Sequence, residues 1–263
     1  MILFAEINFI FKLQPFANWY FPIIWFGYIF MMDALNYKFR KKSMLMNNKK
    51  LFFILLILSA AVWWMFEFIN GFMGNWNYNT FSIFSNIIEK YVFATLSFST
   101  VIPAIFETTD LLLALHLFNH TKLKKKYNIT KSFIYILMFL GILCILLPLV
   151  LPKFTFPLIW LGFFLLLDPW NYMHKHPSII GHLKDKKLTI PLTLFIGGTI
   201  CGFFWEFWNY WAIPKWTYSV PYVGFLKIFE MPILGYLGYG PFALELYAMW
   251  HFVKGLLHME KKN

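Results

Sequence analysis

Long runs of residues without a charged side chain constrain this chain more than any other sequence feature. They lie at 13–32, 51–66, 91–106, 132–152, 154–167, 188–205 and 231–244. A helix that spans the hydrocarbon core of a bilayer needs about 20 mostly apolar residues, which the longest runs provide directly. The shorter runs reach that length when the acidic residue that ends each of them is carried into the bilayer. The sequence therefore predicts a polytopic membrane protein.

The predicted fold is all-α, with seven or eight transmembrane helices. Seven are expected at 17–37, 51–70, 92–119, 132–151, 156–173, 188–210 and 226–254, and residues 1–13 form a shorter eighth apolar segment. The composition agrees, because 60% of the residues are hydrophobic and 13% are charged, whereas soluble domains carry about 25% charged residues. It excludes a disordered chain and a disulfide-stapled secreted module, and it argues against an ordinary soluble enzyme.

The net charge of +11 is explained by the position of the basic residues. Four segments, at 38–50, 122–131, 175–187 and 254–262, hold 18 of the 23 Lys and Arg residues. They alternate with weakly basic connections at every predicted loop, and basic loops stay on the cytoplasmic side of a membrane. We therefore expect a multi-pass cell-membrane protein with a cytoplasmic C-terminus. Nucleic acid is not an expected partner.

The sequence repeats itself. The segment FPIIWFGYIFMMDALNY at 21–37 recurs as FPLIWLGFFLLLDPWNY at 156–172, with eight of 17 positions identical at a constant offset of 135. Three further motifs recur in the same order, namely Glu67…Asn70 with Glu206…Asn209, Trp76-Asn-Tyr78 with Trp216-Thr-Tyr218, and Pro103…Glu107 with Pro241…Glu245. Each predicted helix lies four places before its copy in the order of helices, so the copies share an orientation. Residues 1–125 and 126–263 are expected to form two parallel repeats.

Acidic residues inside the predicted helices are the strongest candidates for function. Seven of the 12 acidic residues lie there, namely Asp33, Glu67, Glu107, Asp110, Asp168, Glu206 and Glu245. A charged side chain at the bilayer centre costs at least about 2.5–3.5 kcal/mol, so such residues face a bundle interior and usually mark function. The four glutamates are the candidate catalytic residues. They converge in the outer half of the membrane if two helices restart at Pro103 and Pro241.

An asparagine follows four of these acids at a spacing of three residues, on the same face of the helix. The pairs are Asp33–Asn36, Glu67–Asn70, Asp168–Asn171 and Glu206–Asn209. An amide can fix the orientation of a carboxyl group in either charge state. Asn70 and Asn209 are therefore expected to orient the glutamates, and the other pairs to orient residues or bind substrate. For Asp33, a structural role at the end of its helix, anchored by Tyr37 and Lys38, fits the sequence as well as a functional role does.

The seven histidines do not form a metal site by pattern. His116 and His120 are one helical turn apart, and His174, His176 and His182 share a loop, but none is duplicated between the repeats. No His-x-x-His-His box, phosphate loop or dinucleotide fingerprint is present. We expect surface histidines, no metal and no cofactor.

Each half resembles the membrane lycopene cyclase domain of carotenoid biosynthesis, of the heterodimeric or fused type. That domain has an acid and an amide at the end of one helix, then a Trp/Tyr-rich turn, then a Pro-x-Glu-Glu-like motif. Both halves keep this order, although the doubled Glu is missing here. The resemblance implies an isomerase that performs a redox-neutral cyclisation or isomerisation of an isoprenoid or carotenoid-like lipid. One protonated Glu donates to a double bond, and a second carboxylate removes a proton.

Two other classes of protein also fit the sequence. A transporter or proton-coupled carrier of a small or lipid substrate has repeats, broken helices and buried acids. A non-catalytic lipid-binding membrane protein explains the hydrophobicity but not the duplicated carboxylates. Membrane lipids and a hydrophobic lipid substrate are the expected partners, and the sequence leaves the oligomeric state open.

Overall fold

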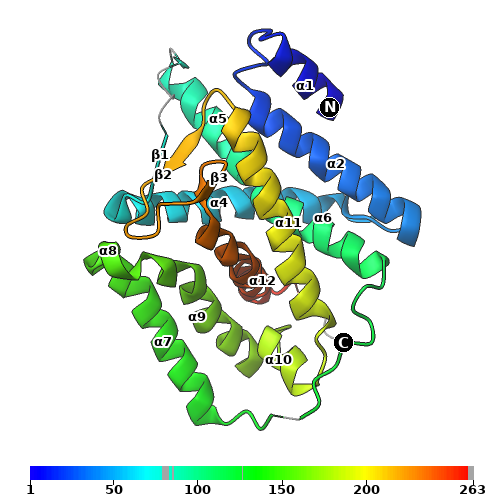
Figure 1. Cartoon of the computed structure of the whole chain (residues 1–263). Helices are drawn as coiled ribbons and strands as arrows, with labels where there is room; N and C mark the ends of the chain where they lie inside the picture. Colours follow the sequence, from blue (N-terminus) through cyan, green and yellow to red (C-terminus); the bar gives the residue numbers. More distant parts are fainter. Residues whose placement is uncertain (79–82, 85, 126, 260–263) are drawn as a thin grey trace. The chain divides into compact units, whose positions relative to one another are not determined.

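The computed structural model describes residues 1–78, 83–84, 86–125 and 127–259 (Figure 1). Its helices are α1 (Ile2–Ile10), α2 (Tyr20–Arg40), α3 (Met44–Asn47), α4 (Lys49–Met73), α5 (Ile87–Ser99), α6 (Val101–Ala114), α7 (Lys131–Val150), α8 (Pro152–Thr155), α9 (Ile159–Met173), α10 (Ile179–Lys184), α11 (Thr189–Trp211) and α12 (Tyr239–Leu256). The 3-10 turns η2 (Phe156–Leu158) and η3 (Ile233–Gly238) precede α9 and α12. The strands are β1 (Trp76–Tyr78), β2 (Trp216–Tyr218), β3 (Lys227–Ile228) and β4 (Met231–Pro232).

The prediction of a mostly helical chain is confirmed. Among the described residues, five helical segments have the length and composition to cross a membrane, namely Lys49–Met73, Ile87–Ala114, Lys131–Val150, Pro152–Met173 and Thr189–Trp211. The predicted helices 17–37 and 226–254 correspond to α2 and α12, which fall outside this set. A total of seven or eight spans and the side of the C-terminus stay predictions.

Two predicted helices are broken in the structure. The predicted helix 92–119 is divided at Thr100 into α5 and α6, and Pro103 occupies the first turn of α6. The predicted start at residue 226 is wrong, because β3, β4 and η3 precede α12. Pro232 lacks the backbone N–H that a continuous helix needs. Pro241 lies in the first turn of α12, so both helices restart next to a proline as expected.

The chain divides into two compact units. Unit 1 consists of Met1–Leu115 and Ile200–Tyr236, and unit 2 consists of His116–Thr199 and Leu237–Asn263, described to residue 259. The predicted repeats have different bounds and stay a prediction from sequence. Residues 126 and 260–263, at the ends of the second repeat, lie outside the described residues.

Unit 1 has an aromatic core. In this unit α2 packs against α1 and α6, and α4 packs against α5 and α6. Trp25 of α2 is fully buried, and its ring centroid lies 4.9 Å from that of Trp208 and 5.2 Å from that of Trp205, both in α11. The strands β1 and β2 pair antiparallel beside these helices.

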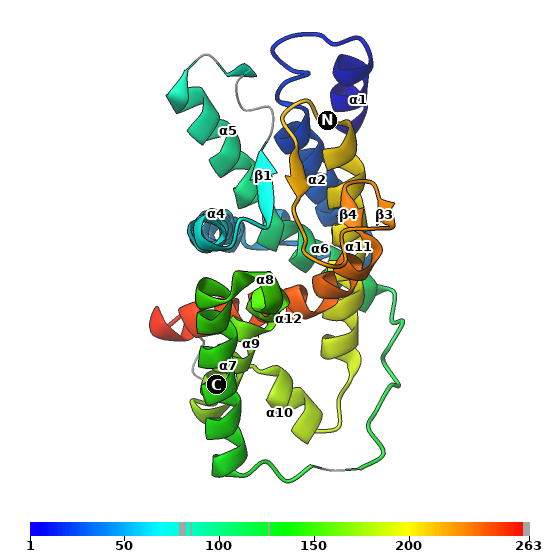
Figure 2. The ribbon, with the colours of Figure 1, turned by 60° about the vertical axis from the view of Figure 1, so that its left-hand side comes forward.

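Unit 2 is built around α9, which packs against both α7 and α12 (Figure 2). Glycines allow α7 and α9 to approach closely. A Cβ atom added at Gly141 would lie 2.6 Å from the backbone nitrogen of Leu166, and one at Gly162 would lie 2.6 Å from Cγ1 of Ile145. A larger residue at Gly141 would meet the backbone of α9 and push the two helices apart, and one at Gly162 would displace the Ile145 side chain.

Candidate functional site

The two copies of the Trp-x-Tyr motif form one small sheet in unit 1. Strand β1 pairs with β2 so that Trp76 lies opposite Tyr218 and Tyr78 lies opposite Trp216. Alternate residues of a strand point to the same face, and residues directly opposite each other share a face. The four aromatic side chains therefore line one face of the sheet, which we call the aromatic face (Trp76, Tyr78, Trp216 and Tyr218).

Glu67 lies against the aromatic face. It comes from the last two turns of α4, and its Oε1 accepts hydrogen bonds from the indole N–H groups of Trp63 and Trp76, each at 3.0 Å. The Tyr78 hydroxyl donates a third bond to the same oxygen. Three donors from a helix and a strand thus hold one carboxylate oxygen in a fixed position.

Glu206 lies against the same face from the second copy of the motif. It is fully buried in the part of α11 that belongs to unit 1, and its Oε1 accepts a hydrogen bond from the Tyr218 hydroxyl at 2.7 Å. The Trp216 indole N–H donates to the Tyr218 oxygen at 2.6 Å. Two glutamates that are 139 residues apart in the sequence therefore meet the same aromatic face.

Asn70 and Asn209 hold the strands and not the carboxylates. The Asn70 amide accepts from the backbone N–H groups of Asn75 and Trp76 at 2.9 and 3.2 Å, and it donates to the Trp76 carbonyl at 2.8 Å. Asn209 accepts from the Trp216 N–H and donates to the Trp216 carbonyl, each at 2.9 Å. Each amide fixes the first residue of a strand, so its orienting effect on the glutamate is indirect.

The tyrosines Tyr78 and Tyr218 were not among the predicted site residues. The sequence could have indicated them, because both belong to the repeated Trp-x-Tyr motif and a buried phenol usually forms a hydrogen bond. Burial and the neighbouring Glu67 carboxylate raise the pKa of the Tyr78 phenol well above its usual range. The phenol therefore keeps its proton and remains a donor to Glu67. Tyr236 in η3 also interacts with Glu206. Burial raises the pKa of the Tyr236 phenol, and the Glu206 charge raises it further.

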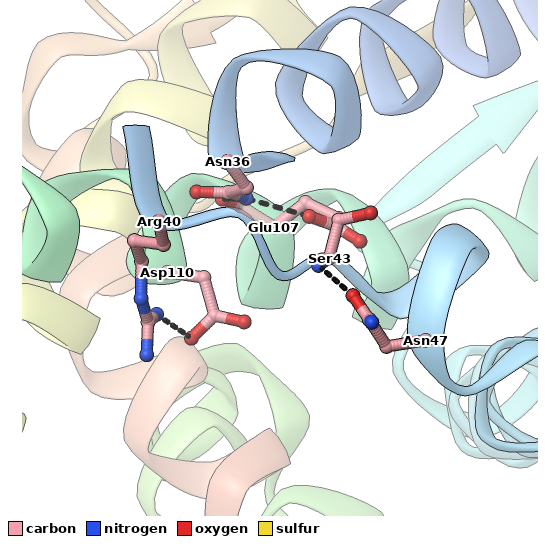
Figure 3. Close-up of polar contacts among 6 residues, drawn as sticks. All are labelled: Asn36, Arg40, Ser43, Asn47, Glu107 and Asp110. Atoms are coloured by element: carbon pink, nitrogen blue, oxygen red, sulfur yellow. Dashed lines mark hydrogen bonds and ion pairs between the residues drawn. The ribbon is translucent and has the colours of Figure 1, made fainter. Parts of the chain in front are cut away.

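Glu107 is hydrogen bonded to α2 and not to the aromatic face (Figure 3). Its side chain is fully buried in α6, and its Oε2 accepts from the Asn36 amide at 2.6 Å. The same amide donates to the Glu107 carbonyl at 2.9 Å. One turn further along α6, Asp110 forms an ion pair of 3.5 Å with Arg40. The Asn36–Glu107 pair therefore joins the last part of α2 to α6, whereas the sequence pattern paired Asn36 with Asp33 of its own helix.

Asp33 and Asp168 each anchor a short helix. Asp33 accepts from the Ser43 hydroxyl and from the Leu45 N–H, at 2.8 and 2.9 Å, where α3 begins. Asp168 is fully buried and accepts from the N–H groups of Ile179 and Ile180 at 2.7 and 2.9 Å, where α10 begins. Carboxylates suit the unpaired N–H groups of a helix start. Both aspartates therefore bind the start of a following short helix, whereas the sequence suggested that Asp33 is anchored by Tyr37 and Lys38 at the end of its own helix.

Glu245 and Asn171 belong to unit 2. Glu245 is fully buried in α12, and its Oε1 accepts from the backbone N–H of Phe163 in α9 at 2.8 Å. Asn171 donates to the Ala248 carbonyl at 2.8 Å, three residues beyond Glu245. Three of the four candidate glutamates thus lie in unit 1 and the fourth lies in unit 2. Within unit 1, the aromatic face brings together Glu67 and Glu206.

No group of three or more His, Cys, Asp or Glu side chains that could hold a metal ion occurs in the described part of the chain. The two cysteines, Cys144 and Cys201, are free. A comparison of the chain with protein-family models, with curated proteins and with solved structures gives no match.

Proposed function

We propose that this chain is an integral membrane enzyme that converts an isoprenoid or carotenoid-like lipid by carboxylate acid/base chemistry. The observation that carries the proposal is the placement of Glu67 and Glu206 against one aromatic face. A resemblance to the membrane lycopene cyclase domain supports the same chemistry. The reaction class is a redox-neutral cyclisation or isomerisation.

The proposed reaction needs one proton on the pair of carboxyl groups. The protonated glutamate adds that proton to a carbon–carbon double bond of the substrate, and a carbocation forms. The π-electrons of a neighbouring double bond attack this cation and close a ring, or the cation rearranges without ring closure. The ionised glutamate then removes a proton from an adjacent carbon and restores a double bond. The pair holds one proton before and after, and the product is an isomer of the substrate.

The aromatic face supplies what a carbocation requires. Indole and phenol rings attract a cation over their faces, and the attraction is strongest where water is excluded. Trp76 is 5% exposed, and Phe21 of α2 packs on the Trp216 ring at a centroid distance of 5.1 Å. The proposal gives a structural role to the remaining candidates, because their observed hydrogen bonds hold helices and helix ends. These candidates are Glu107, Glu245 and the paired aspartates and asparagines.

Expression in a lycopene-producing host tests the proposal. Extracted pigments are compared by chromatography for the wild-type chain, Glu67→Gln, Glu206→Gln and the control Glu89→Gln. Glu89 is a matched control because its carboxylate also accepts an indole N–H, that of Trp19 at 3.3 Å. A new isomer of unchanged mass is expected with the wild type and the control, and neither glutamine variant at positions 67 and 206 should produce it. An unchanged pigment profile with folded wild-type protein in the membrane would refute the carotenoid substrate.

A transporter is the second candidate, favoured by the break between α5 and α6 at Thr100. Interrupted helices beside buried polar residues are typical of transport sites. Counterflow in proteoliposomes separates the two candidates, because an enzyme without carrier activity shows no exchange of labelled substrate across the bilayer. A non-catalytic lipid-binding protein would give neither counterflow nor an isomerised product.

A further inference from the structure

Three histidines from three segments of unit 2 lie close together. His176 follows α9, His182 is in α10, and His251 is in α12. The His182 Nε2 atom lies 3.2 Å from the Tyr247 hydroxyl, and the Tyr247 ring centroid lies 4.4 Å from that of His251. His251 is 9% exposed and interacts electrostatically with both other histidines. We call these three residues the histidine cluster.

The charges around the histidine cluster are mostly positive. The positive charge of Lys187 repels a protonated His182, and that of Lys254 repels a protonated His251. Asp185 is the acidic residue that acts on His182, and it also lies 3.9 Å from the Lys187 ammonium. Burial first, and then the Lys187 charge, lower the pKa of the His182 imidazole, against the opposing effect of Asp185. These surroundings therefore disfavour the charged form of His182.

The backbone of α12 is shaped to admit one member of the cluster. A Cβ atom added at Gly255 would lie 2.1 Å from Cε1 and 2.4 Å from Nδ1 of His176. The imidazole of His176 therefore rests directly on the helix, where any Cβ atom at position 255 would displace it. Such a fixed imidazole loses little freedom when it binds a ligand.

We propose that the histidine cluster binds a phosphate or diphosphate group. An anion reverses the unfavourable like-charge arrangement, because it attracts both lysines and stabilises protonated imidazoles. Imidazolium N–H groups then donate charge-assisted hydrogen bonds to the phosphate oxygens, and the Tyr247 hydroxyl adds a neutral donor. Lys187 and Lys254 would repel a metal cation from the same place. The group is carried by a lipid headgroup or by a soluble phosphate compound.

This site is separate from the proposed chemistry of the carboxylates, and neither depends on the other. Anion binding at the cluster takes up protons, because it favours the charged form of the histidines. The groups that face His182 are Tyr247 and His251 from α12, and Lys187 and Asp185 from the segment after α10. Of these residue types, histidine is the one whose ordinary pKa lies near neutral pH, so it is the group that takes up a proton when an anion binds. The affinity for an anion of constant charge therefore rises as the pH falls.

Nuclear magnetic resonance of the histidine Cε1–H groups tests the proposal on the full chain in phosphatidylcholine nanodiscs. Three probes are used: inorganic pyrophosphate, nanodiscs that contain phosphatidic acid, and sulfate, which stays dianionic between pH 6 and 8. We expect the signals of the histidine cluster to move toward the protonated form, with sulfate binding up to about tenfold tighter at pH 6 than at pH 7. A response to pyrophosphate alone assigns a soluble ligand, and a response to phosphatidic acid alone assigns a lipid headgroup.

Variants localise the effect. His182→Gln and Gly255→Ala are each expected to weaken binding by about tenfold, which is the loss of one charge-assisted contact. The exposed His120 of the same unit provides the control His120→Gln, which should change the affinity by less than twofold. Absence of a response of the cluster to all three probes would overturn the proposal. So would equal weakening by the control, or binding that strengthens as the pH rises.

Discussion

Replacing Asn70 with alanine should unfold the chain at a distinctly lower temperature. The substitution removes three hydrogen bonds to the backbone of Asn75 and Trp76, and it leaves buried backbone groups without these partners. Each such loss costs on the order of 1 kcal/mol or more, so the free energy of unfolding should fall by about 3 kcal/mol. For a chain of this size the melting temperature changes by about 2–4 °C per kcal/mol, which predicts a decrease of about 6–12 °C.

The assay is the fraction of monodisperse protein that remains after heating in detergent, measured by size-exclusion chromatography at one heating rate. Asn209→Ala removes two bonds and should lower the apparent melting temperature by about 4–8 °C. Asn77→Ala is the matched control, because this exposed strand residue makes one long side-chain bond of 3.4 Å to Ser219. Equal shifts in all three variants, or a shift below about 2 °C for Asn70→Ala, would refute the assigned role of the amides.

Three further predictions concern the Tyr78 phenol, the contact between α7 and α9, and the cap that Asp168 provides for α10. Tyr78→Phe should slow the proposed isomerisation by about tenfold, since it removes a donor to Glu67 worth about 1.4 kcal/mol. In the wild-type chain the pKa of Tyr78 is raised, so ultraviolet absorbance should detect no Tyr78 phenolate up to pH 10. A rate within twofold of the wild type would count against that role. Gly141→Ala should destabilise unit 2 by about 1–3 kcal/mol, because its Cβ would lie 2.6 Å from the Leu166 nitrogen, and an unchanged melting temperature would contradict the close approach of α7 and α9. Asp168→Ala should raise the hydrogen-exchange rate of the Ile179 and Ile180 amides by about tenfold, and equal protection in both proteins would exclude the capping role.

The helical segments were predictable because a bilayer-length apolar run leaves few alternatives. The sequence located α4, α7 and α11 to within three residues at each end. The segment 226–238 was missed because its apolar residues resemble a helix by composition alone. Pro232 and the glycines that follow it stop the helix, and a hairpin and a 3-10 turn replace it.

The candidate site was predictable in its parts but not in its assembly. The repeat identified Glu67, Glu206 and both Trp-x-Tyr motifs, since chemistry and spacing recur together. Pairing between strands 138 residues apart leaves no trace in local spacing, so the common aromatic face emerged only from the structure. The same limitation affected Asn70 and Asn209, whose partners lie in the strand that follows and not in the neighbouring acid.

The pairing of β1 with β2 also sets an order of events during synthesis. Unit 1 is discontinuous in sequence, so its first 115 residues leave the ribosome long before the segment 200–236 that completes them. At about 5–20 residues per second, strand β1 waits roughly 7–28 s for its partner. In that interval β1 and Glu67 lack the half of the aromatic face that β2 supplies. A nascent chain halted before Trp216 should consequently be degraded faster than the full-length chain.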